Sequence, residues 1–505
     1  MKGRHSTCRL ICPLTARTVE AMRADMEGAA RMGADAVECR LDMLAKPATQ
    51  EALARLLADA PLPVIATCRP KRQGGLYDGD ESERLEILSL AGRLGAEFLD
   101  VEMDTPENLR PKGKIVLSHH DFHRCPDDLE KIAAAMDGSQ AAANKVAFAA
   151  AGPAEALRAL DVLRTCRKPT MAIAMGEAGV ISRILAPKFN AFGTFASLAE
   201  GAESAPGQPT MSDLKGLYRW DAIGPETAVC GVIGFPLAHS MSPAIHNAAF
   251  AAAGIDAVYV PLLIEPGAEN FEHFMDEALR RAWLSLRGLS VTLPHKENAL
   301  AYVGPENCDE LTCRIGAANT ITIARGGRLT GTNTDYAAAI DSLCRAMGVG
   351  RDALAGRKVA VVGAGGVSRA IVAALAYYRA EVTIYNRTLE RAERLANEFS
   401  CRAAPLSDAA GADAEIVINC TSVGMHPNVG ASPLERIPEA ARVVFDTIYN
   451  PAETRLLRDA GSAGCLTVSG LDMFVEQAVG QFEAWAGVPA PRDVMRRVVV
   501  EKLTR

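Results

Sequence analysis

Residues 358–388 read KVAVVGAGGVSRAIVAALAYYRAEVTIYNRT and decide the fold of the C-terminal half. A short apolar run ends in Gly363-Ala364-Gly365-Gly366, a helix-favouring stretch follows, and a second β-branched run stops at Asn386-Arg387-Thr388. This strand–turn–helix–strand order is typical of a dinucleotide fold, in which glycines let the backbone approach a pyrophosphate at a helix N-terminus. The third fingerprint position is Ser368, which is small enough for close helix–strand packing.

The end of the second predicted strand indicates which dinucleotide binds. NAD-binding proteins usually place Asp or Glu there to accept hydrogen bonds from the ribose. This chain has Asn386 and Arg387 and no carboxylate. Because a guanidinium grips a phosphate with a planar fork, we expect NADP. The alternative is an arginine that is merely solvated at a strand end.

The composition is that of an ordinary globular protein, with 505 residues, 49% of them hydrophobic and 23% charged. A length of this size predicts about two to four domains. The net charge of −7 argues against nucleic acid as a partner, and no apolar run is long enough to predict a membrane span. Thirteen unclustered cysteines and no signal-peptide pattern predict reduced thiols, no metal site and a cytoplasmic location.

Strand-like and helical runs alternate throughout the first half. About eight such βα units in some 220 residues predict a (β/α)₈ TIM barrel, whose chemistry lies at the C-terminal ends of the strands. The predicted strands are Leu10–Leu14, Ala36–Leu41, Val64–Cys68, Phe98–Met103, Ile115–Ser118, Val146–Ala150, Thr170–Ala174 and Phe192–Ala196.

Polar residues occur at the C-terminal ends of the predicted strands, where the active site of such a barrel is expected. Glu38, Arg40 and Asp42 alternate at the end of the second run, so we expect their side chains to share a face. Others close or follow the later runs, namely Arg69, His119, His120, Arg183, Ser204 and Gln208. Lys145 opens an otherwise apolar run, where a cation is costly and a neutral, nucleophilic amine is favoured. The alternative is a lysine that reaches solvent from a strand end.

The first half resembles the type I 3-dehydroquinate dehydratase family. The resemblance is carried by VECRLDML, CRPKRQGG, LSHHDF, NKVAFA, GVISRIL and SAPGQ. It implies that Lys145 forms a Schiff base with the substrate ketone and that His120 is the general acid–base. It further implies substrate contacts from Glu38, Arg40, Arg69, Arg183, Ser204 and Gln208, with Arg183 as the expected carboxylate partner.

One position departs from the family pattern. Where many bacterial members carry a glutamate four residues after the arginine, this chain has Gln73. An amide could hydrogen-bond the histidine but would not stabilise an imidazolium. We expect Glu38 to be the residue that could compensate, and we expect the pH profile rather than the identity of the site to change.

A second α/β region begins at Val229 and surrounds the glycine-rich segment in sequence. Its predicted strands include VCGVIGFP, VYVPLLI, GLSVTLP and NTITIA, and helices are predicted between Thr334 and Leu354 and over Asp472–Ala486. Ser240 and Ser242 begin a helix as caps or as hydroxyls for a ligand. Lys296 and Asp335 follow strands, where they form either a plain ion pair or a proton-transfer pair for carbonyl reduction.

This half resembles the shikimate dehydrogenase family. The resemblance is carried by GFPLAHSMSPAIHN, GLSVTLPHK, GAANTI, GTNTD, VVGAGGVSRA, YNRT, NCTSVGM, DTIYNP and GLDMFVEQA, with Met241 where the family often has lysine. It implies that Lys296 and Asp335 are catalytic. It also implies substrate binding by Ser240, Ser242, Thr292, Asn319, Tyr449 and Gln477, and NADP binding by Gly363, Ala364, Gly365, Gly366, Asn386, Arg387, Thr388 and Gly470.

The order of the two halves is similar to that of the fused plant dehydratase–dehydrogenase family. It implies dehydration of 3-dehydroquinate to 3-dehydroshikimate, then NADPH-dependent reduction to shikimate. The predicted domains are a barrel (1–222), a substrate-binding domain (228–335, completed by 471–505) and a Rossmann domain (336–470). Alternatives are a second site that prefers quinate and a catalytically silent metabolite sensor. The sequence leaves the oligomeric state open.

Overall fold

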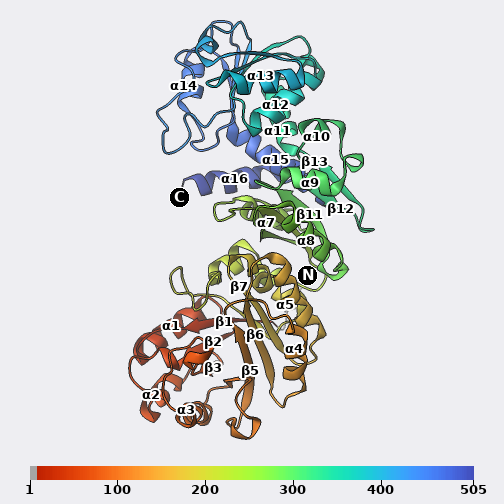
Figure 1. Ribbon diagram of the computed structural model, residues 1–505. Coiled ribbons are helices and arrows are strands. Elements are labelled where there is room, and N and C mark those ends of the chain that lie inside the picture. Colours follow the sequence, from red (N-terminus) through yellow and green to blue (C-terminus); the bar gives the residue numbers. More distant parts are fainter. Residues whose placement is uncertain (1–7, 505) are drawn as a thin grey trace. The chain divides into compact units, whose positions relative to one another are not determined.

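The structure is a computed structural model that describes residues 8–504 (Figure 1). Residues 1–7 and Arg505, the outer ends of the predicted first and last segments, lie outside the described residues. The chain forms two compact units, Met1–Leu237 with Asp256–Leu286 and Ala238–Ile255 with Arg287–Arg505. Between residues 8 and 504, no helix has both the length and the hydropathy to cross a membrane.

The first half is the predicted barrel. Its parallel strands follow one another in the order β7-β6-β5-β4-β3-β2-β1-β8, and the Phe192 N–H donates to the Thr170 carbonyl at 2.9 Å where β8 approaches β7. The strands are β1 (Arg9–Leu14), β2 (Ala36–Arg40), β3 (Val64–Thr67), β4 (Phe98–Glu102), β5 (Lys114–Asp121), β6 (Ala143–Ala149), β7 (Thr170–Met175) and β8 (Gly193–Phe195).

These strands form because their residues are mostly apolar and are buried on both faces, as strands of a parallel sheet covered by helices must be. Apolar side chains such as Ile11, Ile65, Val116 and Ile173 fill a common core. The helices are α1 (Val19–Arg31), α2 (Gln50–Leu57), α3 (Glu81–Arg93), α4 (Leu129–Gly138), α5 (Pro153–Thr165) and α6 (Ile181–Ile184). Several begin at side-chain caps, as α1 does where the Thr18 hydroxyl accepts from the Ala21 N–H.

Two strands, β5 and β6, are longer than predicted by at least two residues, and both carry site residues. β5 continues three residues past the predicted end at Ser118, so that His119 and His120 lie within the strand. β6 starts at Ala143, before the predicted Val146, so that Lys145 is its third residue. Polar residues mask these strand ends in the sequence, yet the pairing of His120 with Ala147 shows that the ladder continues through them.

The next region supplies two strand sets. β9 (Ala228–Gly234) pairs in parallel with β10 (Ala257–Leu263), whereas β11 (Leu286–Val291), β12 (Thr320–Ile323) and β13 (Leu329–Thr332) pair antiparallel in succession. The intervening helices are α7 (Ser242–Ala252), α8 (Ala268–Leu279), α9 (Lys296–Val303) and α10 (Glu310–Ile315). The strands expected from the sequence in this region are therefore present.

Residues 358–469 form the predicted dinucleotide fold. All six strands are parallel in the order β16-β15-β14-β17-β18-β19, the order of a doubly wound dinucleotide-binding sheet. The strands are β14 (Lys358–Val362), β15 (Glu381–Asn386), β16 (Arg402–Pro405), β17 (Ile416–Asn419), β18 (Val443–Asp446) and β19 (Leu466–Ser469). The helices are α12 (Gly366–Tyr377), α13 (Leu389–Phe399) and α14 (Arg455–Ser462).

Helices on either side of this fold pack together. α11 (Thr334–Met347) contacts α15 (Gly470–Ala486), and α16 (Arg492–Leu503) packs on α7 and α15. The helix predicted between Thr334 and Leu354 is shorter than expected, because Gly348 adopts a left-handed conformation with φ of 67° and ends α11. A short 3₁₀ turn follows.

Candidate active sites

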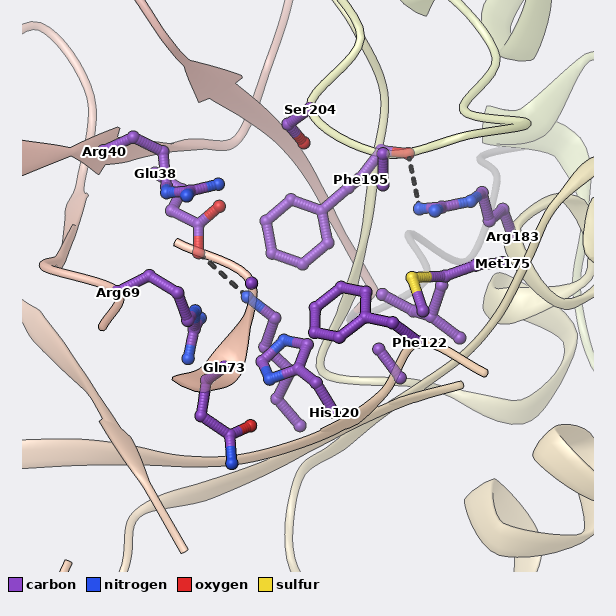
Figure 2. Close-up of a pocket in the computed structure, with 15 residues that line it drawn as sticks. Glu38, Arg40, Arg69, Gln73, His120, Phe122, Met175, Arg183, Phe195 and Ser204 are labelled. Atoms are coloured by element: carbon purple, nitrogen blue, oxygen red, sulfur yellow. Dashed lines mark hydrogen bonds and ion pairs between the residues drawn. The ribbon is translucent and has the colours of Figure 1, made fainter. Parts of the chain in front are cut away.

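The C-terminal ends of the barrel strands surround a pocket of about 540 Å³, open solvent included (Figure 2). The structure brings most of the predicted dehydratase residues together here. The lining side chains are those of Glu38, Arg40, Arg69, Gln73, His120, Phe122, Lys145, Ala147, Ile173, Met175, Arg183, Phe195, Ser204 and Ala205, with Gly74. Of the predicted set only Gln208 does not line the pocket, and its side-chain oxygen accepts from the Ser204 hydroxyl at 3.1 Å and from its N–H at 2.8 Å.

Lys145 lies at the centre of this pocket, but its surroundings are not apolar, contrary to our prediction. Its amine contacts carboxylate oxygens of Glu38 at 2.9 Å and Asp100 at 3.1 Å, and lies 4.5 Å from the centre of the Phe195 ring. The amine is buried and does not reach solvent along the strand, so the alternative of a solvent-seeking lysine is also wrong. Two carboxylates hold the amine at one fixed position in the pocket.

An acidic network beneath the lysine was missed from the sequence. Asp100 and Glu102 are fully buried on β4, and both bind the Arg69 guanidinium, at 2.9 and 2.8 Å. Burial opposes ionisation of Asp100, but Arg69 and Lys145 outweigh it and hold the pKa of its carboxyl below the ordinary value. The signal was present in FLDVE, because two acids at alternate positions of an otherwise apolar strand must meet cations inside a barrel.

His120 is partly buried beside the lysine and is held neutral. Burial, with Arg69 and Lys145 nearby, keeps the pKa of the imidazole well below its usual value. The ring stacks on Phe122, with 5.6 Å between centres and 5° between planes, and Nδ1 has no hydrogen-bond partner among the described residues. A neutral ring that faces the pocket with an open nitrogen can accept a proton.

Gln73 lines the pocket near His120 (Figure 2), but nothing takes over the role of the expected glutamate. The Gln73 side-chain oxygen is buried without a partner among residues 8–504. Glu38 does not compensate, contrary to our suggestion, because its carboxylate accepts from Lys145 and from the Thr67 hydroxyl at 3.0 Å. No carboxylate among the described residues therefore hydrogen-bonds His120.

Arg183 is the pocket's uncompensated cation. The side chain is buried, its NH1 donates only a long 3.4 Å bond to the Phe195 carbonyl, and no carboxylate within residues 8–504 pairs with it. Burial lowers the pKa of the guanidinium to about 10, which still leaves it charged at neutral pH. In Figure 2 it lies across the pocket from Arg40 and Arg69. A buried guanidinium with no anion is arranged to receive one from a ligand.

Arg40 differs from Arg183 because its charge is already compensated. Two parallel hydrogen bonds of 2.9 and 2.7 Å join its guanidinium to Asp42, and the Asp42 carboxylate also accepts from the Leu76 N–H at 3.1 Å. The shared face predicted for Glu38, Arg40 and Asp42 holds for the first two, which both line the pocket, whereas β2 ends at Arg40 and Asp42 lies in the following 3₁₀ turn, where it orients Arg40. Arg40 still presents an edge to the pocket.

In the second unit, Lys296 and Asp335 meet as predicted. Lys296 is the first residue of α9, Asp335 lies in the first turn of α11, and amine and carboxylate are 2.6 Å apart. Both side chains are partly exposed, at 30% and 23%, so a ligand can reach them. The Asn333 side chain caps α11 by accepting from the Asp335 N–H at 3.1 Å, which fixes the carboxylate's helix.

The residues predicted to bind the second substrate occupy several local networks. Neither serine caps α7 with its side chain as suggested: the N-cap is Met241, and the Ser240 hydroxyl accepts only a long 3.4 Å bond from the Ser242 N–H. Asn319 is buried and bonds Thr320 and Thr334, so it positions the start of α11.

The remaining three residues, Tyr449, Gln477 and Thr292, differ in how many of their polar groups are already hydrogen-bonded within the protein. Tyr449 is exposed and stacks on Phe474, with ring centres 4.5 Å apart. The Gln477 amide donates to the Phe474 carbonyl at 3.1 Å, which leaves its oxygen available. Thr292 is half-buried, and its carbonyl accepts from the His295 N–H at the turn before α9. Hydroxyl and amide groups are therefore available on several elements of this unit.

The glycine-rich turn has the geometry that a pyrophosphate needs. Gly363 has φ of 110°, which favours glycine, and Gly365 is the N-cap of α12. A side chain added at Gly365 or Gly366 would meet open space, so these glycines leave room for a ligand rather than for protein. Ser368 accepts from the Gly365 N–H at 3.2 Å and is buried, which explains its presence at the third position.

Arginines that the sequence reasoning missed lie around this turn. A hollow of about 710 Å³ is lined by Ala364, Gly365, Gly366, Arg369, Arg391, Arg394, Leu395 and Glu398. Arg369 is neutralised by Glu398, whereas no described residue pairs with Arg391 or Arg394. The sequence did contain a signal for them. Arg391 and Arg394 lie in the first and second turns of the helix that follows Asn386, three residues apart and thus on one face.

The predicted phosphate-binding loop lies just before α13. The Asn386 amide donates to the Thr388 carbonyl at 2.8 Å, which orders this loop. Arg387 is exposed, and within the described chain no carboxylate engages it. Gly470 is placed by packing rather than by a ligand, because an added Cβ would lie 2.3 Å from the Ile448 carbonyl oxygen.

Comparison with known families agrees with this geometry. The type I 3-dehydroquinase family matches residues 10–225, and the shikimate dehydrogenase substrate binding domain matches residues 232–321. The shikimate / quinate 5-dehydrogenase family matches residues 348–454, and the shikimate 5'-dehydrogenase C-terminal domain matches residues 470–500. The matches follow the order of the predicted halves.

Individual relatives match either the whole chain or its second half. The shikimate dehydrogenase (NADP(+)) of Methanosarcina acetivorans is 40% identical over 54% of this chain and 98% of that protein, and that of Symbiobacterium thermophilum is 41% identical over 54% and 94%. The chloroplastic bifunctional 3-dehydroquinate dehydratase/shikimate dehydrogenase of Arabidopsis thaliana is 38% identical over 97% of this chain and 84% of that protein. The chain therefore belongs to the bifunctional 3-dehydroquinate dehydratase/shikimate dehydrogenase family.

Proposed function

We propose that this chain carries out two consecutive reactions, dehydration of 3-dehydroquinate to 3-dehydroshikimate and NADPH-dependent reduction of that product to shikimate. One observation carries the proposal: a single chain holds both a buried lysine with a neutral histidine in a barrel pocket and a lysine–aspartate pair in a unit with a dinucleotide fold. The 3-dehydroshikimate made in the first reaction is the ketone of the second.

In the barrel, Lys145 is the nucleophile. Its amine adds to the substrate ketone and releases water as the imine forms, and the Glu38 carboxylate, 2.9 Å from the amine, can accept a proton that the amine gives up. The iminium acidifies the adjacent C–H, and neutral His120 takes that proton. The imidazolium then returns a proton to the leaving hydroxyl, which departs as water and leaves a conjugated double bond. Hydrolysis of the iminium by one water finally releases the conjugated ketone and restores the Lys145 amine.

Substrate orientation in this pocket comes from Arg183. Its unpaired guanidinium receives the substrate carboxylate, while Arg40 and Ser204 hold hydroxyl groups on the ring, and Gln208 orients Ser204 through their hydrogen bond. Arg69 is occupied by Asp100 and Glu102, so its role is to set the charge of the site rather than to grip the carboxylate. This assignment differs from the resemblance, which gave Arg69 a substrate contact.

In the second unit, Lys296 protonates the oxygen of the ketone as it is reduced, and Asp335 orients the amine. When bound, NADPH supplies the hydride for this reduction. The residues present fit that cofactor, because Gly365 and Gly366 leave room at the start of α12, and Arg387 offers a free guanidinium. Arg391 and Arg394 add positive charge near the same turn.

The domain limits and the location of the protein are part of the proposal. The dehydratase extends over residues 1–222, and the reductase over residues 228–335, 336–470 and 471–505. A cytoplasmic setting is supported by thirteen cysteines that are all free thiols.

Direct assays of each half test the proposal. Purified protein should convert 3-dehydroquinate to a conjugated product with ultraviolet absorbance, and it should oxidise NADPH when given 3-dehydroshikimate. Because pocket fit distinguishes small substituents by only about 1–3 kcal/mol, quinate must be measured beside shikimate in the oxidative direction. A higher specificity constant for quinate would overturn the substrate assignment, and a protein inactive in both assays would be the silent sensor.

A further inference from the structure

The dehydratase's carboxylate-binding residue stands on a segment that the reductase half contacts. This Arg183 segment, residues 177–189, follows β7 and consists of three short helical turns: Glu177–Gly179, α6 (Ile181–Ile184) and Ala186–Phe189. Every residue from 181 to 188 is buried, although a segment that follows a barrel strand normally runs over the surface. Helix α5 of the barrel contacts all three turns and covers part of the segment, and elements outside the barrel cover another part.

Arg183 depends on this segment for its position. Its side chain makes one long 3.4 Å bond to the Phe195 carbonyl, and its Nε has no partner among the described residues. The backbone is better held: the Trp220 indole donates to the Arg183 carbonyl at 3.4 Å, and the Ser182 hydroxyl donates to the Gly179 carbonyl at 2.8 Å. The position of the segment's backbone therefore determines the position of the Arg183 guanidinium.

The cover from outside the barrel is provided by the reductase half, within the same compact unit. β10 packs on both the 177–179 turn and α6. At the other end of the segment, Phe189 meets the Trp283 ring edge to face, with 5.0 Å between centres, and the buried Lys188 amine donates to the Pro225 and Thr227 carbonyls at 2.8 and 2.7 Å. The segment is held at both ends by residues outside the barrel.

A second set of contacts fixes the covering elements to the barrel. Arg281, just after α8, pairs with Asp161 of α5 at 2.7 Å, and the Arg164 guanidinium lies 5.0 Å from the centre of the Trp283 ring. The Arg281 and Asp161 side chains are 14% and 30% exposed, so this pair is screened less than a surface pair. Trp283 is therefore held between Phe189 of the segment and Arg164 of α5.

We propose that Trp283 and Arg281, two residues of the reductase half, are positioning residues for the dehydratase: they hold the Arg183 segment so that its guanidinium meets the substrate carboxylate. The inference rests on the proposed role of Arg183. It means that the barrel's site is complete only when β10, α8 and the turn that contains Trp283 are docked. The reductase half then contributes to the first reaction as well as to the second.

Steady-state kinetics of full-length variants test the proposal. Trp283→Ala and Arg281→Ala should each raise the dehydratase KM for 3-dehydroquinate by about five- to tenfold, as expected of substitutions that act through packed side chains, with kcat within about twofold. Reductase kinetics with 3-dehydroshikimate should stay within about twofold, since neither residue belongs to the proposed reductase site. Arg280→Ala is the matched control, because Arg280 is 69% exposed and within residues 8–504 pairs with Glu277 alone, so the dehydratase KM of this variant should not change.

Three further variants separate positioning from general damage. Trp283→Phe keeps an aromatic ring against Phe189 and should return KM close to the wild-type value. Exchange of the pair, Asp161→Arg with Arg281→Asp, should restore part of what each single change loses. In an Arg183→Lys background, Trp283→Ala should add less than it does alone, because both changes act on one contact.

Several outcomes would overturn the inference. They are an unchanged KM in Trp283→Ala and Arg281→Ala, additive effects with Arg183→Lys, or a parallel loss of kcat, reductase activity and thermal stability without rescue by Trp283→Phe. Failure of the proposed function looks different. In that case the wild-type protein does not dehydrate 3-dehydroquinate, or Arg183→Lys leaves its KM unchanged.

Discussion

At the scale of single residues, the dehydratase assignment depends on Lys145. We predict that Lys145→Ala abolishes dehydration and also abolishes covalent trapping of substrate by borohydride, because no other buried lysine lines the pocket. The reductase should keep near-normal kcat and KM, since Lys145 lies outside the second unit. Mass spectrometry of borohydride-treated protein is the measurement, and a retained adduct in the variant would place the Schiff base elsewhere.

Gln73 provides a test of how the neutral His120 is maintained. The pKa of His120 is already held well below its usual value, so the free base persists as the pH falls below neutrality. A carboxylate at position 73 would stabilise the imidazolium and raise that pKa. In Gln73→Glu the acid limb of the dehydratase kcat/KM profile should therefore move to higher pH, by about one unit.

The uncharged control is Gln73→Leu, which removes the amide without adding charge. Its acid limb should stay where the wild-type limb is, although its maximal rate can differ. An acid limb that moves equally in both variants would mean that the amide itself, and not charge, sets the proton affinity of His120.

Arg387 is predicted to select the cofactor. Loss of a charge-assisted contact to the 2′-phosphate in Arg387→Ala should weaken NADPH by about tenfold, and NADH far less. Arg402, exposed on the neighbouring strand β16 and paired with Glu381, is a suitable control for the loss of one positive charge. Comparison of KM for both cofactors decides the matter, because equal losses would refute the phosphate assignment.

What the sequence disclosed at this scale was the identity of reactive groups, not their partners. Lys145, His120, Lys296 and Asp335 stand at strand ends or helix starts that local patterns reveal. The carboxylates that contact Lys145 come from β2 and β4, which are distant from it in sequence. Because the residues next to Lys145 in its own strand are apolar, the sequence predicted an apolar site. Arg183 was identified by resemblance, whereas its lack of a counter-ion could be known only from the fold.

At the scale of elements, strands were predicted well wherever apolar runs are flanked by turns. All eight barrel strands fall at the predicted places, because buried parallel strands need continuous apolar residues. The errors occur where function adds polar residues to a strand, as at His119 and His120 of β5. The glycine-rich turn predicted a dinucleotide fold only in combination with a strand before it and a helix and a second strand after it. All three elements are present as β14, α12 and β15.

Gly470 links two elements by close packing, and its replacement should destabilise the second unit. A methyl group there would lie 2.3 Å from the Ile448 carbonyl oxygen, so backbone must move. Gly470→Ala should lower the free energy of unfolding by about 1–3 kcal/mol. Gly461→Ala, in α14 with open space around it, should instead be neutral or stabilising by up to about 1 kcal/mol. Denaturant titration distinguishes them, and equal stability of the two variants would contradict the packing argument.

At the scale of the whole molecule, the sequence predicted two enzymes in one chain but not their contact. Arg281 and Trp283 lie in ALRRAWLSL (residues 278–286), a stretch of arginines and apolar residues with no motif that indicates a contact with the barrel. Only the fold brings them to Asp161 and Phe189, more than ninety residues earlier in the chain by the numbering. Long-range contacts of this kind leave no local pattern, so the dependence of the barrel on its neighbour had to come from the structure.

The central claim is that a ketone made in the barrel is reduced in the C-terminal half of the same chain. The most direct test supplies 3-dehydroquinate and NADPH to the wild type and to Lys145→Ala and follows NADPH absorbance. We predict oxidation by the wild type, none by the variant, and recovery of the variant's rate when 3-dehydroshikimate is added. Oxidation of NADPH by Lys145→Ala on 3-dehydroquinate alone, or none by the wild type on 3-dehydroshikimate, would contradict the account.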